Sequence, residues 1–156
     1  MTTAPIDRLM AKVIKGPRPD DCWLWTGALG DDGYGRIWVF QDGRQKAVRP
    51  HRLSYEATTG ETLSRDVVLM HQCDVPLCVR IDPKHVQAGT TLLNNLDRSA
   101  KRRHANAHTN PWRGNSRQNL AERSRALRAA LLEHGWDEAI IRPLMHGHSP
   151  DQLMLW

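Results

Sequence analysis

The sequence has no long apolar run, few cysteines and fewer acidic than basic residues. No stretch of the 156 residues approaches the roughly 20 consecutive apolar residues that a membrane-spanning helix needs. Residues 1–10 contain Asp7 and Arg8 and no apolar run, which argues against a signal peptide. These absences favour a soluble cytoplasmic protein, and the length suits a single domain with a small extension.

The shortage of acidic residues leaves the chain positively charged. Lys and Arg number 22 against 17 Asp and Glu, so the formal charge is +5 at pH 7. Basic proteins bind anionic partners, of which nucleic acid is the commonest. Residues 98–128 hold nine basic residues and one acid, Glu122. This asymmetry favours an arm that follows a phosphate backbone over an ordinary solvated face.

The three cysteines, Cys22, Cys73 and Cys78, indicate a metal site. An odd number argues against a simple disulfide framework, and cysteines grouped with histidine in a reducing compartment more often bind metal. His85 follows closely, and Cys22 can complete a set of three thiolates and one imidazole. Zinc suits that set, and four protein ligands would leave no open position, so we predict one structural zinc per chain. The alternative is that all three are ordinary buried thiols.

Turn and capping residues predict short strands mixed with helices. The dipeptide Asp42-Gly43 is typical of a two-residue hairpin turn, which would place Val39 opposite Lys46. Residues 72–89 contain two prolines and few apolar residues, so we expect a compact loop that zinc would order. The expected strands are 23–25, 36–41, 44–49 and 66–70, and the expected helices are 6–14, 50–59, 90–99, 116–134 and 137–145.

The last third of the chain is expected to be helical apart from a linker at 106–115. Leu127 and Leu131 fall on one stripe of the helix 116–134. Residues 139–156 loosely resemble the start of a helix-turn-helix, and a packing or dimerisation helix is the favoured alternative. In the helix 90–99 we expect the following residues to face inward: Leu92, Leu93, Leu96 and Ala100.

Four short motifs occur in order between residues 20 and 102. They are Cys22-Trp-Leu-Trp-Thr-Gly27, Tyr34-Gly-Arg-Ile37, His51-Arg-Leu-Ser-Tyr-Glu56, and His71-Gln-Cys-Asp-Val-Pro-Leu-Cys78 followed by Asp82-Pro-Lys-His85 and Asn94. Together they resemble HNH and His-Cys box (ββα-metal) endonucleases, both the small HNH enzymes of phages and the His-Cys box homing endonucleases. The resemblance implies an α+β fold: a ββα-metal nuclease core with an antiparallel hairpin sheet and a structural zinc, followed by a basic helical C-terminal extension.

The resemblance also implies roles for particular residues. His71 matches the general base that activates water, and a histidine of near-neutral pKa can take that proton. Asn94 matches the ligand of a catalytic Mg²⁺ or similar divalent ion, which needs few protein ligands; Asn95 is the alternative. Asp82 stands where the family usually has Asn, and it can still brace the loop. Met70 stands where many members have a metal-binding Asp, which favours single-residue ligation.

An arginine often completes such a site. Arg44 is the first candidate, with Arg36, Arg49 and Arg52 as alternatives, although any one of them could instead be a plain phosphate contact or a solvated group. The predicted DNA-binding residues are basic and lie on the hairpin or in the C-terminal part: Arg36, Lys46, Arg49, Arg52, Lys101, Arg102, Arg103, Arg113 and Arg117.

Residues 1–102 are therefore predicted to form a zinc-stabilised nuclease domain, and residues 103–156 a basic linker with a helical DNA-binding or dimerisation extension. The expected function is metal-dependent, site-specific hydrolysis of double-stranded DNA, in a phage or prokaryotic host and of homing or phage type. A restriction endonuclease of the same chemistry and a non-catalytic zinc DNA-binding module are the alternatives. Cutting both strands with one site per chain would favour a homodimer on a pseudo-palindrome.

Overall fold

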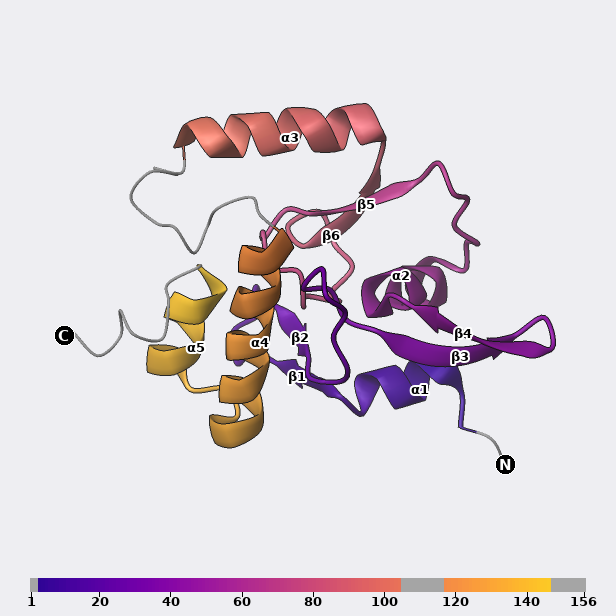
Figure 1. Cartoon of the computed structure of the whole chain (residues 1–156), viewed down its shortest axis with the longest axis horizontal. Coiled ribbons are helices and arrows are strands. Elements are labelled where there is room, and N and C mark those ends of the chain that lie inside the picture. Colours follow the sequence, from indigo (N-terminus) through magenta and orange to yellow (C-terminus); the bar gives the residue numbers. More distant parts are fainter. Residues whose placement is uncertain (1–2, 105–116, 147–156) are drawn as a thin grey trace.

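The computed structural model describes residues 3–104 and 117–146, in which helices and short antiparallel strands alternate (Figure 1). The helices are α1 (Pro5–Met10), α2 (Pro50–Thr59), α3 (Thr91–His104), α4 (Arg117–His134) and α5 (Glu138–Met145). The strands are β1 (Val13–Lys15), β2 (Trp23–Trp25), β3 (Ile37–Gln41), β4 (Arg44–Val48), β5 (Val68–His71) and β6 (Val86–Gly89). The predicted mixed α+β class with antiparallel hairpins is confirmed. None of the helices in the described ranges is long and apolar enough to cross a membrane.

The strands of the described residues pair two by two, as β1-β2, β3-β4 and β5-β6. The β3–β4 hairpin has the predicted register, with Val39 opposite Lys46. Both turn residues have positive φ, 53° at Asp42 and 75° at Gly43, as the Asp-Gly dipeptide predicts. One face of the hairpin buries Ile37 and Val39, while the other face is exposed.

The first helix is shorter than expected. A helix over 6–14 was predicted, but α1 ends at Met10 and residues 13–15 form β1 instead. Val13 pairs with Trp25, and Ile14 pairs with Leu24. The β-branched side chains of Val13 and Ile14 fit a paired strand well, so pairing with β2 prevails over the local helical pattern.

Helix α2 has the predicted bounds, because Pro50 suits the first turn and Gly60 adopts a left-handed φ of 74° after the last one. Its buried face carries His51 and Ser54. The Ser54 hydroxyl donates a hydrogen bond of 2.7 Å to the Val79 carbonyl, which fastens the helix to the loop after β5.

The segment β5–β6–α3 differs from three expectations. Residues 86–89, predicted to be loop, form β6 and pair with β5, so that His71 lies opposite Val86. The Thr90 hydroxyl accepts a hydrogen bond from the Leu93 amide, as expected of a cap, but α3 continues to His104. The predicted inward face is wrong: α3 packs against β5, and the residues of the predicted face are exposed among the described parts of the chain (Figure 1). The exposed residues are Leu92, Leu93, Leu96 and Ala100.

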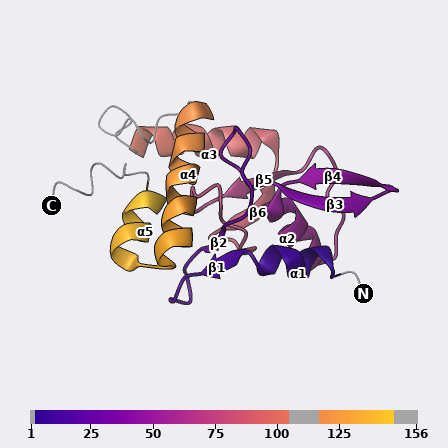
Figure 2. The ribbon, with the colours of Figure 1, turned by 60° about the horizontal axis from the view of Figure 1, so that its bottom comes forward.

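Helices α4 and α5 lie side by side and pack into the main core (Figure 2). They contact each other across a turn at Gly135, whose φ is 67°. The core that they share with β2 and with the loop after β5 includes these buried residues: Leu24, Trp25, Val75, Leu77, Val79, Leu127, Leu131, Ile141, Leu144 and Met145. The predicted linker at 106–115 and the last ten residues of the helix-turn-helix-like tail lie outside the described residues.

Candidate metal centre and adjoining histidine site

The four predicted zinc ligands lie together. The ligand atoms of Cys22, Cys73, Cys78 and His85 are all within 4.8 Å of one another. Nδ1 of His85 is 3.4 Å from the Cys22 sulfur and 3.6 Å from the Cys78 sulfur. A tetrahedral zinc ion with ordinary bond lengths separates a sulfur ligand from a nitrogen ligand by roughly 3.6 Å. The cluster could therefore hold a metal such as zinc.

Backbone pairing brings the distant Cys22 to the other three ligands. Cys22 directly precedes β2, and β2 pairs with the loop after β5. The Trp25 amide donates to the Leu77 carbonyl at 2.9 Å, and the Val79 amide donates to the Trp23 carbonyl at 2.8 Å. Residue 78 lies between these two bonds, so its thiol is held beside that of Cys22.

The three cysteine thiols of the cluster shift one another's pKa values. Hydrogen bonds with the neighbouring thiols raise the pKa of Cys22, and burial raises the pKa of Cys78 to about 12. Hydrogen bonds from these two thiols lower the pKa of Cys73 below its ordinary value. A bound divalent cation would stabilise the thiolate forms of all three cysteines.

The surroundings of His85 orient it for metal binding. Its Nε2 donates a hydrogen bond of 2.9 Å to the Asp20 carbonyl, so the lone pair of Nδ1 faces the sulfurs. Asp82 braces the turn before it: the side chain accepts from the Lys84 amide at 2.8 Å, and the carbonyl accepts from the His85 amide at 3.1 Å. An ion pair of 2.6 Å joins Asp82 to Arg80. Asp82 thus braces the loop, as the sequence interpretation expected.

His71 lies at the end of β5 and is tied directly to the metal cluster. Its Nε2 is 3.1 Å from the Cys78 carbonyl. Because a carbonyl only accepts, the ring proton lies on Nε2 and the basic lone pair lies on Nδ1. Burial lowers the pKa of His71, although the charge of Cys73 and the bond to Cys78 act in the opposite direction. The neutral ring, which can accept a proton, is therefore the main form at pH 7.

Two further rings surround His71. The ring centroids of His51 and His71 are 4.7 Å apart, and Tyr34 lies 5.7 Å from His51 and 5.8 Å from His71. Burial lowers the pKa of His51 well below its ordinary value, and the neighbouring His71, Arg49, Arg52 and Arg36 act in the same direction. His51 is thus a neutral buried residue that holds the His71 ring.

An arginine pair borders this ring cluster. Arg49 lies 4.6 Å over the Tyr34 ring and donates to Asp32 at 2.8 Å. Arg36 donates to the same carboxylate at 2.9 Å. Burial alone would raise the pKa of Asp32, but the bond from Arg36, the Tyr34 amide and the charge of Arg49 lower it. Asp32 is not among the site residues predicted from the sequence, although its spacing of four residues from Arg36 was a usable signal.

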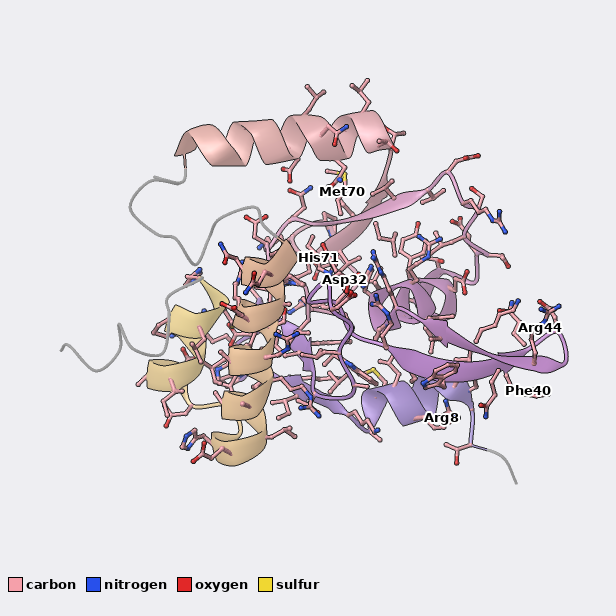
Figure 3. All side chains as sticks on the ribbon, viewed as in Figure 1. Arg8, Asp32, Phe40, Arg44, Met70 and His71 are labelled. Carbon is pink, nitrogen blue, oxygen red and sulfur yellow. The ribbon has the colours of Figure 1, made fainter. Side chains whose placement is uncertain are left out.

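The predicted arginines occupy different places. Arg44 is exposed next to the hairpin turn, and Figure 3 shows it at the opposite end of the hairpin from His71, so the structure does not bring the two together. Arg49, one of the predicted alternatives, lies on Tyr34. Arg52 donates to the Val67 carbonyl at 3.2 Å and so holds the segment before β5.

Asn94 lies on the helix that packs against the strand of His71. Its side chain is half-buried, whereas that of Asn95 is exposed. Helix α3 contacts β5, so Asn94 is the one of the two that faces the protein body. Among the basic positions, Lys46 forms an exposed ion pair of 2.9 Å with Asp42. Residues 101–103 lie in the last turn of α3, Arg117 begins α4, and residue 113 lies outside the described ranges.

Two phage proteins are similar to this chain. Protein 7.7 of Escherichia phage T7 is 43% identical over 86 residues, which cover 55% of this chain and 61% of the relative. Protein 2.8 of the same phage is 38% identical over 76 residues, which cover 49% of this chain and 48% of the relative. The chain thus spans only about half to three fifths of these relatives, whose names state no activity. No family model and no solved structure matches it.

Proposed function

We propose that this chain is a metal-dependent endonuclease of the HNH / His-Cys box type that hydrolyses phosphodiester bonds in double-stranded DNA. The observation that carries the proposal is the double use of Cys78. Its sulfur belongs to the metal cluster and its carbonyl orients His71. A structural zinc would thereby fix a neutral imidazole in one tautomer and one orientation, which a general base needs. A loop that only stabilised a fold would not require this link.

The order of elements supports the same function. A strand ends in His71, a loop carries three of the metal ligands, a second strand follows, and Asn94 lies on the next helix. We assign β5, β6 and α3 to a ββα-metal unit. This unit needs two separate ions, a structural zinc at the cysteines and a catalytic ion beside Asn94.

In the proposed reaction His71 accepts a proton at Nδ1 from a water molecule. The water oxygen forms a bond to the phosphorus, and the bond from phosphorus to the 3′ oxygen breaks. The side-chain oxygen of Asn94 would hold a Mg²⁺ ion, which when bound neutralises charge on the phosphate and on the leaving oxygen. The leaving 3′ oxygen takes a proton from a solvent water and becomes a hydroxyl, and His71 later releases its own proton to solvent.

We assign the site's arginine to Arg49 in place of Arg44. Arg49 lies against Tyr34, which contacts His71, whereas Arg44 is at the far end of the hairpin. Asp32 fixes one end of the Arg49 guanidinium. A guanidinium held in this way could contact the phosphate with little further loss of side-chain freedom.

The phage origin of both similar proteins favours a phage enzyme, of homing type, over a restriction enzyme with the same chemistry. A zinc-containing DNA-binding module without the reaction is the contrasting function. Such a module would need neither His71 nor Asn94.

The test is cleavage of supercoiled plasmid by zinc-loaded protein with Mg²⁺, and with EDTA as the blank. We expect His71→Ala to slow cleavage by about 10²–10⁴-fold, the usual contribution of a general base. Asn94→Ala should behave similarly, while the matched controls His134→Ala and Asn95→Ala should cut normally. If the wild type does not cut DNA of several sequences with Mg²⁺ or Mn²⁺, the proposal that the chain is an endonuclease is wrong. If Asn95→Ala is inactive and Asn94→Ala is active, the metal ligand is reassigned.

A further inference from the structure

The outer face of the β3–β4 hairpin exposes two large aromatic side chains. Trp38 is 58% exposed and Phe40 73% exposed, although the opposite face of the same strand is buried. Figure 3 places Phe40 near the outer end of the hairpin. Arg8 of α1 donates a hydrogen bond to the Trp38 carbonyl, which fastens the strand to the body of the protein. Neighbouring exposed aromatics on a well-held strand mark an interaction surface.

The spacing of the two rings suits a flat ligand. Residues two apart on a strand lie on the same face about 6.8 Å apart. Bases in a nucleic-acid strand stack about 3.4 Å apart, which is half that distance. Rings that projected in parallel from Trp38 and Phe40 would leave room for one base between them.

The same face leads to the proposed catalytic site. The register pairs Trp38 with Ala47 and ends at Ile37 opposite Val48. Arg36 and Arg49 directly flank that last pair, and both donate to Asp32. Arg49 lies over Tyr34, whose ring contacts His71. Two of the four basic residues at 36–49, Arg36 and Arg49, lie at this end of the hairpin and share one carboxylate, Asp32, so one positive charge is left over for a partner with an anionic backbone. We call the face carrying Trp38, Phe40 and Arg49 the aromatic track.

We propose that the aromatic track stacks unpaired bases of the DNA strand whose phosphate lies at His71. The inference rests on the proposed nuclease function and names its substrate class: DNA with unpaired bases beside the cleaved bond. A closed duplex presents base edges to a surface, and exposing the flat faces costs unstacking energy. Exposed rings therefore favour bases that are already unpaired, where stacking is sequence-tolerant.

The experiment measures binding without cleavage, by fluorescence anisotropy in Ca²⁺. Three labelled ligands are compared: a blunt duplex, the same duplex with a single-stranded tail, and that tail made of abasic nucleotides. Wild type should bind the tailed duplex roughly five- to 150-fold more tightly than the abasic one, the range of one stacked base. Trp38→Ala and Phe40→Ala should lose that preference and bind the blunt duplex normally.

Matched variants separate stacking from apolar bulk and from general damage. Phe40→Trp should keep the preference, and Phe40→Leu should lose most of it. Leu132→Ala removes an equally exposed apolar side chain from α4 and should bind like wild type. Because these side chains are exposed, circular dichroism should show all the variants folded.

Equal affinity of the wild type for natural and abasic tails would overturn the inference. A wild-type dimer that Trp38→Ala dissociates, with DNA binding unchanged, would also overturn the inference. The aromatic track would then be an interface between two copies of the chain. The nuclease proposal fails separately. If the protein binds natural tails preferentially but does not cut DNA, the nuclease proposal is refuted and the aromatic track stands. If it cuts DNA normally but shows no base preference, only the aromatic track is refuted.

Discussion

Replacing His85 by alanine should unfold much of the protein, because it removes one ligand and the zinc with it. Structural zinc sites contribute about 10–16 kcal/mol of apparent binding free energy at pH 7. The loop they order buries Val75, Leu77 and Val79 in the core, and each such side chain contributes about 1.5–3 kcal/mol. The free energy of unfolding of a whole domain is only about 5–15 kcal/mol. Losing even half of the free energy of zinc binding would therefore remove most of the protein's free energy of unfolding.

The assay is urea unfolding followed by tryptophan fluorescence, with zinc measured on the same samples. Trp23 and Trp25 lie close to Cys22 in the chain, so their emission should report the metal centre. We expect one zinc per wild-type chain, and none in a His85→Ala protein that unfolds at least 5 kcal/mol more easily, roughly the lower end of whole-domain stability. His134→Ala, a change on exposed surface, should cost less than about 0.5 kcal/mol. A folded wild type without zinc, or a His85→Ala protein as stable as wild type, would refute the predicted structural zinc.

Three further predictions concern α4, α2 and the arginine of the site. Arg123 donates to the Asp74 and Met145 carbonyls at 2.6 and 2.7 Å, so Arg123→Ala should cost about 3 kcal/mol in urea unfolding. His51 has a depressed pKa in the folded protein, so the unfolded chain binds more protons below about pH 6.5. Stability should therefore be full above that pH and fall as the pH drops below it, and His51→Gln should flatten the fall. Arg49→Ala should slow plasmid cleavage by about 10²-fold, as loss of a charge-stabilising group does.

Each of these predictions has a control that can contradict it. Arg125 is exposed on the same helix as Arg123, and equal losses from the two alanine variants would show that the buried bonds contribute nothing special. An unchanged pH slope in His51→Gln would place the acid sensitivity elsewhere. Arg44→Ala should cut like wild type, and a larger loss there than in Arg49→Ala would restore Arg44 as the arginine of the site.

The features that could be predicted from the sequence are local or chemically distinctive. Asp42-Gly43 needs positive φ at two positions and so determines the hairpin register. Pro50 and Gly60 mark the two ends of α2 by their own backbone preferences. The cluster of possible metal ligands could be predicted because three cysteines and a nearby histidine leave few other sets of soft donors.

The features that could not be predicted depend on partners distant in the chain. β6 is a strand of four residues that forms because β5 lies beside it, and its own composition reads as loop. The pattern of α3 identified an apolar stripe but could not say whether a second layer covers it, so Leu92 was placed inside. The choice between Arg44 and Arg49 depends on where the hairpin lies relative to β5, which no local pattern contains.

We propose that His71, held by the Cys78 carbonyl, is the general base for DNA hydrolysis. The most direct measurement is the initial rate of plasmid cleavage in Mg²⁺ by wild type and His71→Ala, compared at equal zinc content and equal stability. We predict a rate at least about 10²-fold lower for the variant, with DNA binding unchanged. A zinc-loaded, folded His71→Ala protein that cuts within a few-fold of wild type would contradict the claim.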